Sequence, residues 1–111
     1  MVDDLLSLHD SIRYVAVYRD EALSTASQPG RDGASAAESD RYEELLVNPT
    51  LLRLVTQRGN IDCGGLDYVV VRYGNFFQLV VPTAWGHVSV CVEPDGDPLA
   101  VAKRVTAFLT A

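Results

Sequence analysis

Hydrophobic and polar residues alternate between Leu66 and Glu93, and this alternation predicts three consecutive β-strands. The expected strands are Tyr68–Tyr73, Phe76–Pro82 and His87–Glu93. Gly74 and Asn75 form a two-residue turn signal between the first two strands, which predicts a hairpin close to the primed type. Residues 83–86 supply the turn into the third strand. The second half of the chain is therefore expected to contain a three-stranded meander.

Shorter patterns at the start of the chain predict a helix followed by two strands. A first helix is expected from a cap at Asp3 or Asp4 to about Ser11, because apolar residues recur there on one helical face. Those apolar residues are Leu5, Leu8 and Ile12. Tyr14–Tyr18 is apolar on both faces, so we expect an interior strand. Ala22–Ser27 contains small residues that suit an edge strand.

The middle of the chain predicts a loop and a long helix. Gln28–Ala37 is rich in proline and glycine, so we expect a flexible surface loop. A helix is then expected over Ser39–Arg58, capped by Ser39 or Asp40. Asn48–Pro49 should interrupt it, because proline after an asparagine cap marks a new helical start. Gly59 should end the helix as the residue just past its last turn.

A last helix is predicted over Pro98–Leu109, with Asp97 as its cap. The apolar stripe of this helix consists of Val101, Ala102, Val105, Phe108 and Leu109. The predicted order is helix, two strands, helix, three strands, helix. Neither an internal repeat nor an interdomain linker divides the 111 residues. We therefore expect a single α+β domain over residues 1–111.

Composition and charge add mainly exclusions. The formal net charge of −6 argues against nucleic-acid binding, which needs clustered lysine and arginine to contact phosphates. Asp3 and Asp4 place acid where a signal peptide needs base, and no apolar run approaches the ~20 residues that cross a bilayer. We therefore expect a cytoplasmic protein without membrane insertion, in which Cys63 and Cys91 are reduced thiols.

Residue types that perform chemistry are present but are not arranged for it. Gly59–Gly65 lacks the Lys-Ser/Thr of a phosphate-binding loop and precedes a strand rather than a helix. His87 and Cys91 are four residues apart on one strand, roughly 13 Å, which is too far for a shared zinc ion. Nothing in the sequence positions an activating base beside Cys63. We therefore predict no catalytic residue, no cofactor and no metal site, and a protein that is not an enzyme.

Two smaller signals each have two interpretations. Asp40, Glu43 and Glu44 are acidic enough to coordinate a cation, but they fit a dipole-stabilised helix start more simply. Trp85 lies in a strand connection, where it either contacts a partner or, more commonly, caps the edge of the core.

Two surface features indicate that the chain binds a partner. The middle helix carries more apolar residues than one core face requires. These residues are Leu45, Leu46, Leu51, Leu52, Leu54 and Val55. The three-strand segment is apolar on both faces, and an edge strand at Asp67–Tyr73 would have to be covered or paired. Self-association is a natural completion of both features.

The order and lengths of these elements resemble the roadblock/LC7 family, a profilin-like relative of the longin domains. The likeness spans nearly the whole chain. It rests on Ile12–Tyr18 as the first strand, Ser39–Arg58 as the long middle helix, Leu66–Glu93 as the meander and Pro98–Leu109 as the closing helix. The chain departs from the family where Arg19-Asp20-Glu21 replaces a frequent glycine, and where Asn48–Pro49 interrupts the middle helix.

The resemblance implies a five-stranded antiparallel sheet, with the first and last helices on one face and the middle helix on the other. It also implies a homodimer that joins two sheets through Tyr42–Val55 and Asp67–Tyr73. The interface residues expected on this basis are Tyr42, Leu45, Leu46, Leu52, Val55, Val69, Val71 and Tyr73. Family members lack an active site of their own, and several regulate or scaffold small Ras-like GTPases. We therefore expect a non-enzymatic dimeric regulatory domain with a small GTPase as its partner.

Two other functions are compatible with the sequence. A small-molecule sensor of profilin- or PAS-like fold would enclose its ligand in an apolar cavity lined by residues such as Phe77, Leu79 and Val90. A small enzyme would use Cys63 as its nucleophile, although the sequence suggests no substrate for it.

Overall fold

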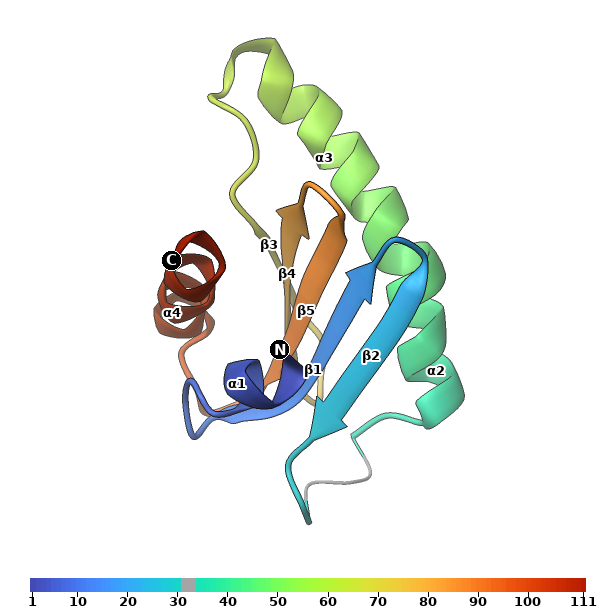
Figure 1. Cartoon of the computed structure of the whole chain (residues 1–111), viewed down its shortest axis with the longest axis vertical. Helices are drawn as coiled ribbons and strands as arrows, with labels where there is room; N and C mark the ends of the chain where they lie inside the picture. The colour runs from blue at the N-terminus through green and yellow to red at the C-terminus, as the bar shows by residue number, and fades with distance from the viewer. Residues whose placement is uncertain (31–33) are drawn as a thin grey trace.

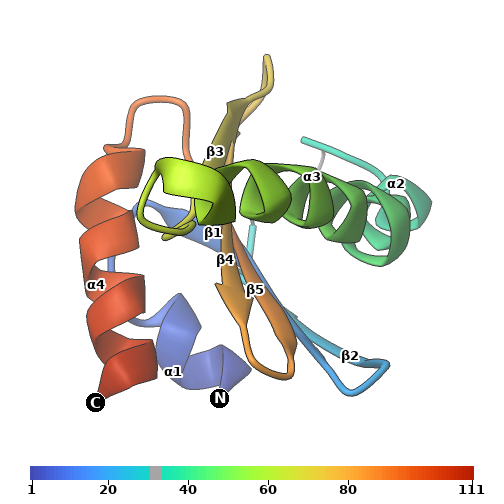
Figure 2. The ribbon, with the colours of Figure 1, turned by 90° about the horizontal axis from the view of Figure 1, so that it is seen from above.

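Two helical layers enclose an antiparallel sheet in the computed structural model of the chain, which describes residues 1–30 and 34–111 (Figures 1 and 2). The helical elements are α1 (Val2–Leu6), α2 (Ala37–Tyr42), the π-helical segment η1 (Glu43–Val47), α3 (Asn48–Asp62) and α4 (Pro98–Thr110). The strands are β1 (Ile12–Arg19), β2 (Ala22–Ser27), β3 (Val69–Arg72), β4 (Phe77–Thr83) and β5 (Gly86–Val92). Their order in the sheet is β2-β1-β5-β4-β3, and neighbours are antiparallel. The predicted α+β class and five-stranded sheet are confirmed.

The main hydrophobic core lies between the sheet and the layer formed by α1 and α4 (Figure 2). Its completely buried members are Leu5, Ile12, Val15, Leu79, Val88, Val90, Val92, Val101, Ala102 and Val105. Burial of one such side chain stabilises the fold by about 1.5–3 kcal/mol. At the start of α4, the Asp97 side chain accepts hydrogen bonds from the backbone N–H groups of Leu99, at 3.0 Å, and Ala100, at 3.3 Å. The predicted cap and stripe of the last helix are therefore confirmed.

The first helix is shorter than predicted, because α1 ends at Leu6. Leu5, Leu8 and Ile12 do all pack in or against the core, as their spacing suggested. They reach it from different elements, however, since Leu8 lies in a turn and Ile12 begins β1. The three residues therefore have the spacing of a helix face, although they belong to a helix, a turn and a strand that pack in the same core.

The middle helix runs without a break from Ala37 through α2, η1 and α3, because the residues at both junctions keep right-handed helical backbone angles. The predicted interruption at Asn48–Pro49 is wrong. Pro49 has no N–H to donate to the preceding turn, and the wider π-helical turn of η1 lies directly before it. The predicted caps Ser39 and Asp40 are also wrong, since α2 already begins at Ala37.

Gly59 does not end the middle helix, as was predicted, but lies buried within it. A Cβ atom at this position would be 3.0 Å from the carbonyl carbon of Gly65, so the missing side chain admits the returning backbone. The helix ends at Asp62. Gly64 (φ 83°) and Gly65 (φ 89°) then turn the chain through the left-handed region that favours glycine.

The strand positions follow the predictions, but the turns do not. β1 lies in the sheet interior, whereas β2 and β3 end the strand order, as expected for an edge strand of small residues and for the leading strand of the meander. The Gly74-Asn75 turn is not of the primed type, because neither residue has a positive φ. The primed geometry occurs instead between β1 and β2, at Asp20 (φ 49°) and Glu21 (φ 71°).

The loop predicted over Gln28–Ala37 is described in part. Residues 28–30 and 34–36 form neither helix nor strand, and Ala37 begins α2. Residues 31–33, which belong to the same prediction, lie outside the described part of the chain.

We expect the double substitution Asp20→Asn, Glu21→Gly to stabilise the protein by about 1 kcal/mol, because asparagine and glycine adopt positive φ with less strain. Urea unfolding of the variant and wild type measures the difference. The matched control places Asn-Gly at residues 74 and 75, where both φ values are negative, and should bring no gain. Equal effects at the two turns would contradict this account.

Candidate functional site

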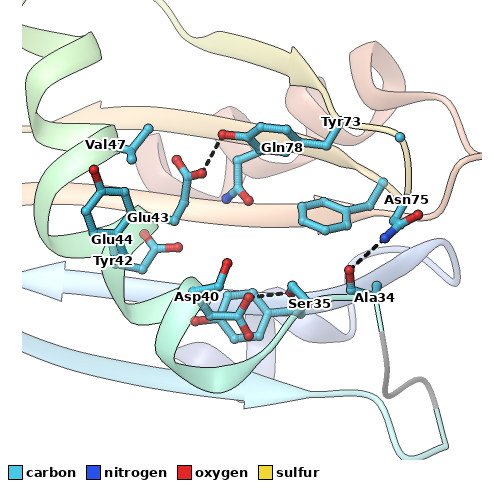
Figure 3. A pocket seen from close by; sticks show the side chains of 14 residues that line it. Ala34, Ser35, Asp40, Tyr42, Glu43, Glu44, Val47, Tyr73, Asn75 and Gln78 are labelled. Atoms are coloured by element: carbon cyan, nitrogen blue, oxygen red, sulfur yellow. Dashed lines mark hydrogen bonds between the residues drawn. The ribbon is translucent and has the colours of Figure 1, made fainter.

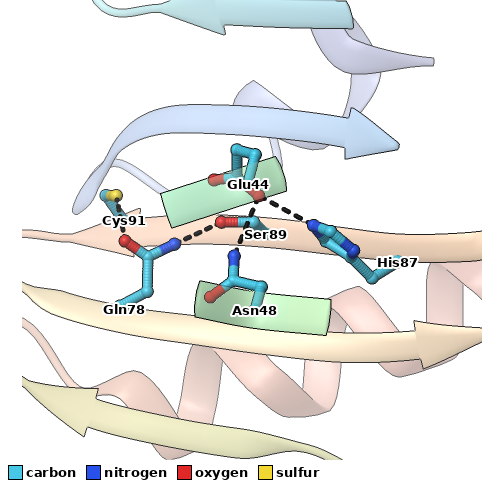
Figure 4. A network of polar contacts seen from close by, with 6 residues as sticks. All are labelled: Glu44, Asn48, Gln78, His87, Ser89 and Cys91. Atoms are coloured by element: carbon cyan, nitrogen blue, oxygen red, sulfur yellow. Dashed lines mark hydrogen bonds and ion pairs between the residues drawn. The ribbon is translucent and has the colours of Figure 1, made fainter. Parts of the chain in front are cut away.

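The sheet face beneath the middle helix carries a layer of buried polar side chains (Figure 4). The prediction that both faces of the strand block are apolar is therefore wrong for this face. The residues of this polar layer are Glu44 and Asn48 from the helix, Gln78 from β4, and His87, Ser89 and Cys91 from β5. Buried polar groups are tolerated when they bond to one another, which makes their pairing decisive for how the helix docks.

The centre of the polar layer is a contact between Glu44 and His87. Glu44 Oε1 lies 2.8 Å from His87 Nε2, and the two side chains are only 1% and 2% exposed. The amide of Asn48 donates to the same Glu44 oxygen at 2.9 Å. The Tyr18 ring stacks on the imidazole, with centroids 5.4 Å apart and planes inclined by 17°. Asn48, predicted as a helix cap, therefore serves as a partner of Glu44.

The other half of the layer is a chain of neutral hydrogen bonds. Gln78 donates through Nε2 to the Ser89 hydroxyl, and the Cys91 thiol donates to Gln78 Oε1 at 3.2 Å. Burial, reinforced by the negative charge of Glu44, raises the pKa of the Cys91 thiol above its ordinary range. Cys91 is therefore a neutral donor within the fold rather than a reactive thiolate.

A cavity of about 360 Å³ opens beside the polar layer, between the helix, β1 and the β3–β4 turn (Figure 3). We call it the acidic pocket. Its lining residues are Tyr14, Ala34, Ser35, Ser39, Asp40, Tyr42, Glu43, Glu44, Val47, Tyr73, Gly74, Asn75, Phe76 and Gln78. On its walls, the Tyr73 hydroxyl donates to Glu43 Oε1 at 2.6 Å, and the Ser35 hydroxyl donates to Asp40. The pocket thus brings together the three acidic residues that the sequence placed at a helix start.

Titratable groups in the acidic pocket are shifted toward their protonated forms. Burial raises the pKa of Glu43, and the nearby Glu44 raises it further, while the Tyr73 hydrogen bond acts in the opposite direction. Burial and the hydrogen bond to Glu43 raise the pKa of Tyr73 to about 12. Burial also raises the pKa of Tyr14, with the charges of Glu44 and Asp40 adding to the effect. Burial is the largest cause of each of these three shifts, and neighbouring acidic side chains add to it.

The residues predicted for a partner interface fall into two groups. On the helix, Tyr42, Leu46 and Val55 are exposed and Leu45 is half-buried, whereas Leu52 is only 8% exposed and packs inside the subunit. On and after β3, Val69, Val71 and Tyr73 are half-buried. The interface list omitted two of the most exposed apolar side chains of α3, Leu54 and Ile61. Leu54 had been counted among the surplus apolar residues of the predicted helix, whereas Ile61 lay beyond the predicted end of that helix at Gly59.

Other candidate residues have structural surroundings. Cys63 is exposed, and Arg58 donates to its sulfur at 2.9 Å. The Arg19 guanidinium lies 4.1 Å from the centre of the Trp85 ring, which packs against the main core. Trp85 thus takes the core-edge role that was the commoner interpretation of its sequence position.

The ligand cavity expected for a sensor was placed around Leu79 and Val90. Both residues are completely buried within the main core, and Phe77 packs against it. The acidic pocket lies on the opposite face of the sheet. In the described part of the chain, no group of three or more His, Cys, Asp and Glu side chains is placed to hold a metal ion.

No protein-family model matches this chain, and the search of curated proteins found no match. The resemblance to roadblock/LC7 proteins therefore stays a prediction from element order and length. Within residues 1–30 and 34–111, no helix is long and apolar enough to span a membrane.

We expect His87→Phe to destabilise the fold by about 3–5 kcal/mol, because it keeps a ring beside Tyr18 but leaves the buried Glu44 carboxylate without its main partner. Urea unfolding measures the loss. Adding Glu44→Leu to His87→Phe should restore much of the stability, since both polar partners are then removed. The exposed pair Arg58–Asp62, at 2.9 Å, supplies the control, and Arg58→Ala should change stability by no more than about 1 kcal/mol. Similar losses in both single variants would contradict a special role for the buried pair.

We expect Glu43→Gln to raise the melting temperature at pH 7. The pKa of Glu43 is higher in the folded state than in the unfolded state, so the protonated side chain favours folding at pH values below the unfolded-state pKa. This contribution to stability is lost as the pH rises through the folded-state pKa. Glutamine stays neutral, so the advantage of the variant should shrink toward pH 4 and grow toward pH 7. Thermal melts across this range test the sign, with Glu21→Gln as an exposed control. The prediction would be overturned if the melting temperature of the wild type rose relative to that of the variant between pH 4 and pH 7.

Proposed function

We propose that this chain is a non-enzymatic regulatory domain that acts as a homodimer, with a small Ras-like GTPase as its partner. One observation carries the dimer: the open edge strand β3 ends beside the middle helix, and that helix carries exposed apolar side chains. Tyr73, directly after β3, donates to Glu43 of η1 and so fixes the end of that strand beside the helix. A second copy of the chain can cover both features at once.

β3 offers backbone groups to a partner strand. It pairs with β4 on one side and is last in the strand order. The Tyr73 N–H donates to the Phe76 carbonyl of the neighbouring chain segment. In an antiparallel ladder, hydrogen-bonded and non-hydrogen-bonded residue pairs alternate, so the next pair, Arg72–Phe77, is not hydrogen-bonded. The backbone N–H of Arg72 therefore points toward the open edge. Such an edge is a template for another strand. Pairing between two β3 strands across a two-fold axis would join two sheets into one.

The helix supplies the apolar part of the proposed interface. We call its exposed residues the helix strip: Tyr42, Leu46, Leu54, Val55 and Ile61. Leu46, Leu54 and Ile61 are 56%, 60% and 74% exposed and are spaced eight and seven residues apart, so they lie along one side of the helix. A second copy presents the same strip, and two such strips can bury one another in an isologous contact.

The GTPase part of the proposal rests on the resemblance to the roadblock/LC7 family. The chain has the layer arrangement that this resemblance implies, with α1 and α4 on one face of the sheet and the middle helix on the other (Figure 2). A partner of this kind needs no catalytic group on the chain itself. In the polar layer, the side chains hydrogen-bond to one another within the fold. This arrangement agrees with a regulatory role better than with a catalytic one.

We expect the wild-type protein to sediment as a dimer at micromolar concentration, because the helix strip and the β3 edge are both left uncovered in one subunit. Leu54→Glu should convert it to a monomer, since a charge in the strip opposes burial. Ala107→Glu adds the same charge at an exposed position of α4, on the opposite face of the sheet, so it is the matched control and should remain dimeric. A wild type that sediments only as a monomer would contradict the dimer.

The same variants test the partner. Wild-type protein and Leu54→Glu are used to capture proteins from the source cells, and the captured proteins are identified by mass spectrometry. A small GTPase retained by the wild type supports the proposal. If no GTPase is retained while dimerisation holds, the GTPase part is wrong and the dimer stands.

A further inference from the structure

We propose that the acidic pocket binds a guanidinium group, carried either by an arginine of a partner protein or by a small guanidino compound. The inference goes beyond the proposed dimer and does not depend on it, because one chain supplies every group that it uses. It starts from two carboxylate oxygens. Within the described residues, Glu43 Oε2 and Glu44 Oε2 are buried and have no hydrogen-bond partner.

Glu44 gives the stronger of the two arguments. Its side chain is only 1% exposed, and its Oε1 atom is already engaged by His87 and Asn48. The second oxygen of this carboxylate is left without a donor among residues 1–30 and 34–111. A buried acceptor without a partner is costly to the fold, and more so when it is charged. Figure 3 shows the Glu44 side chain beside those of Tyr42 and Glu43, on the helix wall of the acidic pocket.

Glu43 places a second acceptor next to the first. Its Oε1 atom accepts from Tyr73, which holds the side chain in the pocket wall, and its Oε2 atom is the other buried oxygen without a donor in the described chain. The two glutamates are consecutive residues of the π-helical turn and both line the cavity. The site therefore has two adjacent carboxylates, each with one oxygen held by the fold and one buried oxygen that lacks a hydrogen-bond donor among the described residues.

A guanidinium group matches these demands better than other cations. It carries five N–H donors in a rigid plane, stays charged at any physiological pH, and is more weakly hydrated than an ammonium group. The pocket also contains the aromatic rings of Tyr14 and Phe76, against which a planar cation can stack. Its volume of about 360 Å³ leaves room for the aliphatic part of the ligand as well.

The charge around the site favours a cation. The described lining residues include Asp40, Glu43 and Glu44 but no lysine, arginine or histidine. The chain as a whole carries a formal net charge of −6, so general attraction alone would also draw cations to other acidic surfaces. The open surface pocket formed by Asp10, Glu93, Asp95 and Asp97 provides an internal comparison for that attraction.

The test is an NMR titration of the full-length protein, following backbone amide shifts. The probes are N-acetyl-arginine methylamide and butylguanidine, and each is paired with its uncharged isostere, N-acetyl-citrulline methylamide or butylurea. We expect saturable shifts at Glu43, Glu44, Tyr73 and Gln78 with both guanidinium probes and not with the isosteres. A lower dissociation constant for the arginine derivative identifies a protein arginine as the natural ligand. A lower dissociation constant for butylguanidine identifies a small compound.

Glu43→Gln is the decisive variant, because it removes one carboxylate and leaves the Glu44–His87–Asn48 contacts in place. We expect it to raise the dissociation constant of the arginine derivative by about 10-fold or more, because one charge-assisted hydrogen-bonded pair is lost. Glu21→Gln, at an exposed acid in the β1–β2 turn, should leave the affinity unchanged. The proposal is overturned if the isosteres bind equally, if the shifts gather around Asp95 and Asp97, if no shift saturates, or if Glu43→Gln binds like wild type. Because sedimentation and titration are separate measurements, a monomeric wild type that binds the probe would remove the dimer and keep this site.

Discussion

The contact between Glu44 and His87 is the constraint on which the second layer of the molecule depends. The main core beneath α1 and α4 is apolar and specifies position through shape and volume. Beneath the middle helix, by contrast, buried apolar residues such as Leu52 and Val80 are mixed with the buried polar side chains of His87, Ser89 and Gln78. A buried polar pair adds little net stability over an apolar replacement, but leaving one of its members without a partner is strongly destabilising. The helix is thus held in the one register that brings Glu44 over His87.

The π-helical turn links this constraint to the acidic pocket. Pro49 cannot donate a backbone hydrogen bond, and the chain widens its helix over Glu43–Val47 immediately before it. Glu43 and Glu44 occupy the start of that turn, where one reaches Tyr73 and the other reaches His87. Asn48, next to the proline, closes the group by donating to Glu44. The same few residues therefore accommodate the proline in the helix and supply the partners of the buried polar layer.

Local chemistry predicted much of the fold and little of the site. Alternation located β4 and β5, and Asp97 with Pro98 located the start of α4, because these signals depend on residues close in sequence. The strand block was expected to be apolar on both faces, and Glu44 was interpreted as part of a dipole-stabilised helix start. His87 and Glu44 are far apart in sequence, so no local pattern announces that they are buried together. Asn48–Pro49 misled for the same reason, since a cap and a buried amide have the same sequence signature.

The exposed helix strip follows from how the middle helix is fastened at two points. Glu44, Asn48 and Leu52 are buried toward the start of the helix. Near its other end, Gly59 lies against the backbone of Gly65, which a Cβ atom at position 59 would crowd at 3.0 Å. A helix held at both ends cannot rotate to bury Leu54 or Ile61 without breaking one of these contacts. The apolar side chains between and beyond the two points therefore remain at the surface, and the open edge of β3 is the strand through which the proposed dimer would pair.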